Sequence, residues 1–310
     1  MDIVDCHAHV ASSRYIPDEF FDGWIENIEA NALSMNVRQR EVLANVFREI
    51  NNDPMCDEYI SQMDAAGIRR SVLLIIDFKY VYGEPFDDML EIYRLHKEVV
   101  DRHPGRFICY AGVDPRRGQA GVDLLQTGIR DFGFEGLKLY PPCGFSPSDE
   151  RLYPYYEVCE AYGVPVLSHI GPTTPSLSFS FSRPEGIDEA ARRFPKVNFV
   201  LGHAGSTHYQ EAAVLAEYRP NIFLDVSGFQ AAARRGEFDA LMSFHKKQGI
   251  VNKLLFGTDW PIHRLLGNQK KWVQEFIALQ EKKILSTGEL ERIMAGNFNR
   301  IYTSRLRCAA

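Results

Sequence analysis

The sequence predicts an α/β fold, a (β/α)₈ TIM barrel with a helical insertion after its first strand. Short runs rich in Val, Ile, Leu and Phe alternate with stretches of helical composition, and eight such runs are present. Their near-continuous apolar character indicates strands buried on both faces, as in a parallel sheet covered by helices. Eight strands of this kind favour a closed barrel. The expected strands are residues 3–6, 71–76, 106–113, 133–140, 164–168, 197–202, 222–227 and 253–257.

The segments between these runs favour helices. Residues 86–102, 150–162, 185–194 and 209–218 have helical composition, and prolines stand just before four of the expected strands. A doubly wound sheet is the alternative architecture, but it usually carries a Gly-rich phosphate loop after its first strand. Here that turn reads CHAH, so the barrel is favoured.

A long connection, residues 11–66, separates the first two expected strands. It contains Phe20, Phe21 and Trp24, followed by a polar helical stretch at 36–52. Connections of this length are often functional lids, and a packing appendage is an equal alternative. Because a single α/β barrel commonly exceeds about 250 residues, we expect one domain over residues 1–310.

Composition and charge limit the possible functions. The chain has 45% hydrophobic and 25% charged residues, as an ordinary globular protein does. Its net charge of −6 argues against nucleic-acid binding, since a phosphate-binding face needs concentrated Lys and Arg. We therefore expect a small-molecule substrate. The protein could be a homo-oligomer or a monomer, and no residue pattern decides between the two.

The location of the chain is expected to be cytoplasmic, with no membrane contact. No apolar run is long enough for a transmembrane helix, and the first five residues carry acid where a secretory signal carries base. The cysteines lie scattered without CxxC spacing, so we expect reduced thiols. They are Cys6, Cys56, Cys109, Cys143, Cys159 and Cys308.

Metal-ligating residue types gather at the ends of the expected strands, where an α/β barrel builds its active site. The first run ends in DCHAH, the fifth in SHIG, the sixth in GHAG and the eighth in GTDWP. These motifs place His7, His9, His169, His203 and Asp259 at one end of the barrel. If the first strand continues through its motif, the period of two puts its two imidazoles on the same side.

A single His at a strand end is more often structural, and HxH alone is a weak pattern. Four strand ends that deliver His and Asp together instead indicate one bound divalent ion. Imidazole and carboxylate favour Zn²⁺, with Mn²⁺ or another first-row ion as the alternative. His96, His103 and His245 fall in or near expected helices, and His263 lies past the last turn. The site needs none of these four.

The ordered set of motifs resembles the amidohydrolase superfamily, in the amidohydrolase-2 branch that includes aminocarboxymuconate-semialdehyde decarboxylase and related TIM-barrel hydrolases. DCHAHV, SHIG, GHAG, FGTDWP, GLKLYPP and the C-terminal GNFNRIY carry the resemblance over nearly the whole chain. It implies that His7, His9, His169 and Asp259 are metal ligands. It also implies that Asp259 acts as general base and that His203 polarises the substrate or shuttles a proton.

Lys138 in GLKLYPP has more than one interpretation. Superfamily enzymes with two metals bridge them with a carbamylated lysine on the fourth strand. The branch resembled here generally uses one metal, so we favour a cation that binds a substrate carboxylate over the bridge. A structural lysine is the third alternative. Further candidates for substrate binding are Tyr140, Arg183 and Trp260, with His208, Asp225 and Arg14 as lesser ones.

Two reactions fit such a site, and both occur in the resembled branch. We favour hydrolysis by metal-activated water of an ester, lactone, amide or C–C bond in a small carboxylate-bearing or aromatic substrate. The reason is the resemblance itself: an intact HxH pair and a strand-four Lys look hydrolase-like. Nonoxidative decarboxylation of an aromatic or conjugated acid is the alternative. A non-catalytic barrel that retains its metal is a more distant one, because structural zinc normally takes four protein ligands.

Overall fold

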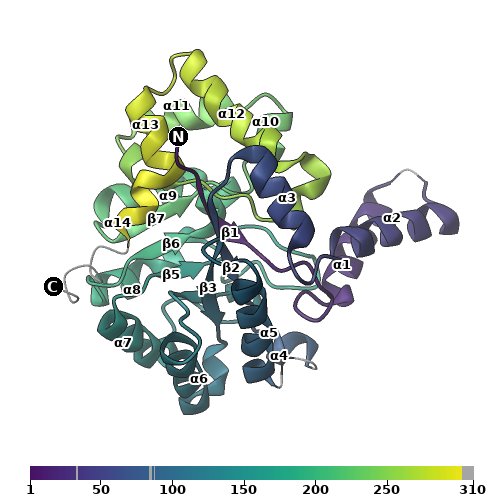
Figure 1. Cartoon of the computed structure of the whole chain (residues 1–310), viewed down its shortest axis with the longest axis vertical. Coiled ribbons are helices and arrows are strands. Elements are labelled where there is room, and N and C mark those ends of the chain that lie inside the picture. The colour runs from purple at the N-terminus through teal and green to yellow at the C-terminus, as the bar shows by residue number, and fades with distance from the viewer. Residues whose placement is uncertain (33, 84–85, 87, 302–310) are drawn as a thin grey trace.

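The strands form a single parallel sheet in which each strand pairs with the next one in the chain. The computed structural model describes residues 1–32, 34–83, 86 and 88–301. Its eight strands follow the order β1 to β8, with helices between them, so the predicted (β/α)₈ barrel is confirmed (Figure 1). The strands are β1 Val4–Ala8, β2 Arg70–Leu74, β3 Phe107–Gly112, β4 Leu137–Leu139, β5 Val166–Ser168, β6 Phe199–Leu201, β7 Ile222–Asp225 and β8 Leu254–Leu255.

The barrel closes where the end of β1 meets the turn after β8. The backbone N–H of His9 donates to the Trp260 carbonyl at 2.7 Å, and the N–H of Asp259 donates to the His7 carbonyl at 2.7 Å. Ala8 and Trp260 form a parallel bridge between these hydrogen bonds. Backbone hydrogen bonds therefore hold two predicted site segments, far apart in sequence, side by side.

Every strand differs from its expected range by at least one residue, and three differences bear on the site or on strand length. β1 extends through His7 to Ala8, where we expected it to end at residue 6. β4 and β8 are shorter than residues 133–140 and 253–257. Before β4, Gly133 turns the chain at φ 71°, and Phe134 is buried without belonging to the sheet. Apolar character predicts burial, and only some of the buried residues pair as strands.

The predicted helices are present, with small shifts at their starts. α9 (Tyr209–Tyr218) has the expected bounds. α5 (Met89–Arg102) begins later than expected because the Asp88 side chain caps it, accepting a hydrogen bond from the Glu91 N–H at 3.0 Å. α7 (Tyr153–Tyr162) and α8 (Asp188–Arg193) follow short 3₁₀ turns that occupy the start of each expected range.

The remaining helices complete the outer layer. They are α4 Lys79–Tyr82, α6 Gln119–Arg130, α10 Gln230–Arg234, α11 Phe238–Lys247, α12 Gln269–Glu281, α13 Thr287–Glu291 and α14 Asn297–Arg300. Within the described part of the chain, no helix combines the length and apolar character needed to cross a membrane. The five cysteines among the described residues are buried free thiols, and Cys308 lies outside those residues.

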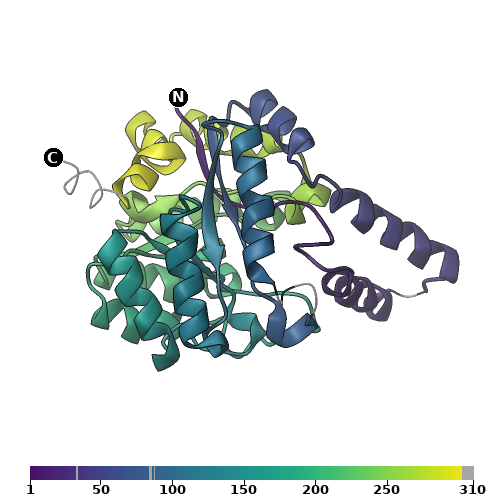
Figure 2. The same cartoon turned by 60° about the horizontal axis from the view of Figure 1, so that its bottom comes forward.

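The insertion between β1 and β2 is helical, as expected. It contains α1 (Asp18–Asn31), α2 (Val37–Ile50) and α3 (Asp57–Ala66). α1 and α2 form a hairpin that projects to one side of the barrel, whereas α3 packs against α12 (Figures 1 and 2). A Cβ added to Gly23 in α1 would overlap the Thr174 hydroxyl, so the hairpin lies closely on the loop after β5.

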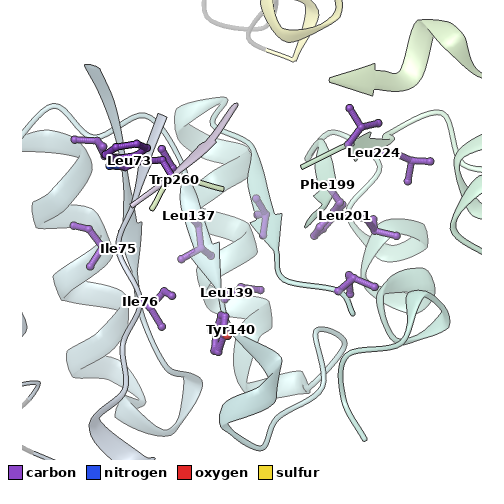
Figure 3. Packing of buried hydrophobic residues seen from close by; sticks show 14 of the residues in the cluster. Leu73, Ile75, Ile76, Leu137, Leu139, Tyr140, Phe199, Leu201, Leu224 and Trp260 are labelled. Atoms are coloured by element: carbon purple, nitrogen blue, oxygen red, sulfur yellow. The ribbon is translucent and has the colours of Figure 1, made fainter. Parts of the chain in front are cut away.

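Alternate side chains along the strands enter two separate apolar clusters. One cluster, with Leu137 and Leu139, packs between the sheet and the helices (Figure 3). The other, with Leu167 and Val200, belongs to the inner face of the barrel, and Phe298 from α14 joins it. Because Lys138 stands between two residues of the outer cluster, the strand period of two turns its side chain to the barrel interior. The strand geometry therefore places the Lys138 side chain on the inner face of β4.

Replacement of Gly112 by Ala tests how closely β3 approaches the segment after β2. The added Cβ would overlap the backbone carbonyl of Ile75, which cannot move aside as a side chain can. Overpacking of this kind typically costs about 1–3 kcal/mol, so we expect a lower free energy of unfolding in urea. Gly288→Ala in α13 is the control, since its Cβ meets nothing within 4 Å. Equal stability of the two variants would contradict the assigned packing.

Candidate metal centre

Three donor atoms from opposite ends of the sequence meet at the carboxyl end of the barrel. Asp259 Oδ1 lies 3.4 Å from His7 Nε2 and 3.5 Å from His9 Nε2. All three side chains are buried, and their donor atoms lie within 4.8 Å of one another. β1 carries His7, His9 follows that strand directly, and the turn after β8 carries the carboxylate. The arrangement can hold a divalent cation.

The far nitrogen of each imidazole is held by an acceptor. His7 Nδ1 lies 2.5 Å from Asp225 Oδ2, and His9 Nδ1 lies 2.7 Å from the Leu74 carbonyl. A protonated Nδ1 that donates to such an acceptor leaves the Nε2 lone pair free, as is typical of metal-binding histidines. Burial, aided by the Lys138 ammonium, holds the pKa of His7 well below its usual value. The neutral imidazole needed by a metal is thus favoured.

Asp225, at the end of β7, is itself fixed by its neighbours. Its Oδ1 accepts from the Ser227 N–H at 2.7 Å and its Oδ2 from the Ser227 hydroxyl at 2.9 Å. A Cβ on Gly257 would overlap Oδ1, so glycine is required there. The sequence suggested Asp225 only as a lesser candidate and did not indicate Ser227. An acid at the end of a buried strand was the available signal.

His169 and His203 form a second histidine pair beside the three donors. His203 Nε2 lies 3.1 Å from His169 Nδ1, and the His203 ring centroid lies 4.8 Å from that of His7. His203 Nδ1 lies 3.0 Å from the Ser227 hydroxyl, so one serine contacts both this ring and Asp225. His169 lies in the same cavity, but its ring nitrogens face His203 and the Gly171 carbonyl.

Two of these residues adopt unusual backbone conformations. His203 has φ 60° and Asp259 has φ 52°, and Ala204 and Ser206 continue the run with φ 45° and 47°. Non-glycine residues rarely adopt positive φ, and such positions cluster at functional sites where the surroundings compensate for the cost. The strained turns after β6 and β8 project their side chains into the centre.

Lys138 and Tyr140 reach the centre from β4. Lys138 Nζ lies 3.4 Å from His7 Nε2 in a fully buried position. Burial lowers the pKa of this lysine to about 8, against the opposing effect of Asp259 and Asp225. The Tyr140 ring lies 4.7 Å from that of His169.

Arg183 and Trp260 do not line the cavity that contains the histidines and Asp259. Arg183 is half exposed on the loop after β5 and pairs with Glu185 at 3.1 Å, because that loop turns outward to the surface. Trp260 is buried, but its ring stacks on Tyr59 at 4.9 Å, on the other side of the strand-eight turn. Arg14 is exposed, and the lesser candidate His208 lines the same outer hollow as Arg183.

Two further groups at the site were not predicted. His263 was not expected to belong to the site, yet its Nε2 lies 3.5 Å from Asp259 Oδ2 and its ring lines the cavity. Asp5 accepts hydrogen bonds at 3.0 Å from the N–H groups of His7 and Thr258, which ties β1 to the turn after β8. Burial raises the pKa of Asp5 to about 7. Position i+4 from an acid was the only local signal for His263.

A cavity of about 380 Å³ opens over the donor atoms. His7, His9, His169, His203 and Asp259 form its floor. The helical insertion contributes seven residues to its walls, so the segment expected to be a lid or a packing appendage takes part in the site. The insertion residues are Ile16, Phe20, Phe21, Trp24, Ile28, Phe47 and Ile50.

Comparison with known proteins identifies one matching family and a set of similar solved structures. A family model described as amidohydrolase matches residues 4–303. No curated protein matches the sequence. Among solved structures, 5-carboxyvanillate decarboxylase from Novosphingobium aromaticivorans, with bound manganese, is 14% identical with a TM-score of 0.70, and the match covers 97% of each chain.

Two other similar structures have different names. 4-Oxalomesaconate hydratase from Rhodopseudomonas palustris is 21% identical with a TM-score of 0.61, covering 99% of this chain and 97% of the other. A probable 2-pyrone-4,6-dicarboxylic acid hydrolase from Acinetobacter baumannii is 16% identical with a TM-score of 0.63, covering 98% and 100%. At such identities the likeness shows a shared fold, not a shared reaction.

Replacement of Asp225 by Asn tests how the centre is oriented. The amide keeps the shape of the side chain but removes the carboxylate that faces His7 Nδ1. Loss of such a partner typically weakens metal binding by about 10–100-fold, which a titration of Zn²⁺ against a competing chelator would measure. Asp188→Asn is the control, because this acid pairs with Arg219 far from the cavity. Unchanged affinity in Asp225→Asn would refute the orienting role.

Proposed function

This chain belongs to the amidohydrolase family, and we propose that it is a metal-dependent hydrolase that holds one divalent ion through His7, His9 and Asp259. The family membership confirms the resemblance carried by the sequence motifs. The observation that carries the proposal is the convergence of the two Nε2 atoms on one carboxylate oxygen, with each far nitrogen already held by an acceptor.

The donor set fits a catalytic ion. Two imidazoles and one carboxylate suit Zn²⁺ or Mn²⁺, and three protein donors leave room for water and substrate. When bound, such an ion acts as a Lewis acid and lowers the pKa of its water toward neutrality. We favour Zn²⁺, and the manganese in one similar structure keeps Mn²⁺ as the alternative. His169 is proposed as a further ligand from the family motifs.

The chain's own residues supply proton transfer. Asp259 is proposed to accept the proton of the attacking water and return it to the leaving group. The ring of His203 is positioned by the Ser227 hydroxyl at 3.0 Å and faces the same cavity, where it can donate to a developing oxyanion. Lys138, buried beside His7, is proposed to attract a carboxylate at the reacting end of the substrate.

Decarboxylation is the second candidate, and Lys138 is the observation that favours it. A buried ammonium beside the metal ligands can hold the carboxylate that leaves, and one similar structure is named as a decarboxylase. The C–C bond electrons would remain on the substrate carbon, which takes a proton from Asp259 or His203 as CO₂ departs. Hydrolysis adds water to the product, whereas this reaction does not.

His203→Ala separates a catalytic histidine from a metal ligand. We expect the variant to keep its metal and to lose about 10²–10⁴-fold in turnover, the usual contribution of a positioned acid or base. Metal content and rates would be measured across a panel of lactones, esters and aromatic carboxylates. His208→Ala is the control, because this residue lies outside the cavity. Loss of metal would make His203 a ligand, and a wild type without turnover on any substrate would favour a non-catalytic barrel.

Removal and return of the metal tests the reaction class. Chelation should abolish turnover, and Zn²⁺ or Mn²⁺ should restore it. With an active substrate in H₂¹⁸O, hydrolysis predicts one labelled oxygen in the product. Release of CO₂ with no label in the organic product would instead establish a decarboxylase and overturn the hydrolase.

A further inference from the structure

The cavity over the metal centre is polar at its floor, and most of its other lining side chains are apolar. Tyr140, Thr173, Ser206 and His263 are the polar exceptions. Aromatic rings form a continuous wall: Phe20 lies 5.5 Å from Phe21 and 6.0 Å from Phe78, and Phe21 lies 5.4 Å from Phe47, all between ring centroids. Trp24 also faces the cavity. Apart from Phe78, these residues belong to the α1–α2 hairpin, which therefore supplies most of the aromatic surface in the cavity.

The rim of the cavity is apolar too. Ile28 on α1 is 38% exposed, and Leu265 on the turn after β8 is 49% exposed, yet both line the cavity. The apolar wall therefore continues outward from the floor.

No cationic group is available to a charge at the far end of this cavity. Among the described residues that line it, Asp259 is the one acid, and none is Lys or Arg. Arg264 on the nearby turn lies over Trp260 and donates to the Ile50 carbonyl, outside the cavity. Arg183 pairs with glutamates on the outer surface. A second carboxylate on the substrate would therefore be buried without a Lys or Arg partner.

We propose that this site takes a substrate with one polar reacting group and an uncharged apolar remainder at least as large as a phenyl ring, which the α1–α2 hairpin encloses. The inference rests on the proposed function only in assigning the polar end of the substrate to the metal centre. Dicarboxylates, such as the compound for which one similar structure is named, are disfavoured because their second charge meets the aromatic wall.

A matched pair of hydroxamic acids tests this selectivity on the metal-loaded protein. 4-Phenylbutanohydroxamic acid presents a metal-binding end and a neutral ring, and its para-carboxylate analogue differs only in the distal charge. Isothermal titration should show the neutral compound binding on the order of 100-fold more tightly, because an unpaired charge resists burial. The neutral dye N-phenyl-1-naphthylamine should also fluoresce in the cavity with or without metal.

Ile28→Arg should narrow or reverse the preference by placing a guanidinium at the rim, where partial exposure tolerates it. Val42→Arg is the matched control: it adds the same charge to the same hairpin, at a position 56% exposed and not lining the cavity. The control should keep the wild-type preference, which separates a local effect from a change in net charge.

The outcomes separate this inference from the proposed function. Equal binding of the two hydroxamates, with no dye fluorescence, would overturn the apolar substrate while leaving the metal enzyme intact. Dye binding with neither hydroxamate bound would support the apolar cavity and count against the metal centre. A Val42→Arg effect as large as that of Ile28→Arg would also overturn the assignment of the rim.

Discussion

The contact between His7 Nδ1 and Asp225 Oδ2, at 2.5 Å, is the interaction on which the centre depends. It joins β1 to β7 through the barrel interior and directs His7 Nε2 toward Asp259 and Lys138. Its geometry requires a glycine at 257, because a side chain there would overlap the carboxylate. Ser227 holds the same carboxylate and also contacts His203, so the orientations of the two histidines are coupled.

The barrel and its insertion contribute different properties to the site. Strand ends provide nitrogen and oxygen donors at fixed positions, as parallel barrels do in unrelated chemistries. The α1–α2 hairpin provides a wall of aromatic and aliphatic side chains over those donors. Its close approach to the loop after β5 at Gly23 fixes the hairpin against the barrel. The polar donors and the apolar wall thus come from separate segments, so similarity of the barrel alone does not transfer the wall.

Local sequence patterns predicted the fold and named most of the side chains that meet at the candidate centre. Apolar runs and helical stretches are set by neighbouring residues, so the strand order and helix positions could be predicted. The HxH motif, Asp259 and His203 stood out because barrels place their chemistry at strand ends. Strand length was less predictable: Phe134 is apolar and buried, but the turn at Gly133 keeps it outside the sheet.

By itself the sequence determined the barrel class and the candidate metal-binding residues at the strand ends. Only the tertiary structure decided how those residues are oriented and what surrounds them. Asp225 lies 218 positions from His7, and no local pattern reports a hydrogen bond over that separation. The same limit explains why His263 enters the site while Arg183 and Trp260 remain outside it, since loop direction depends on packing between distant segments.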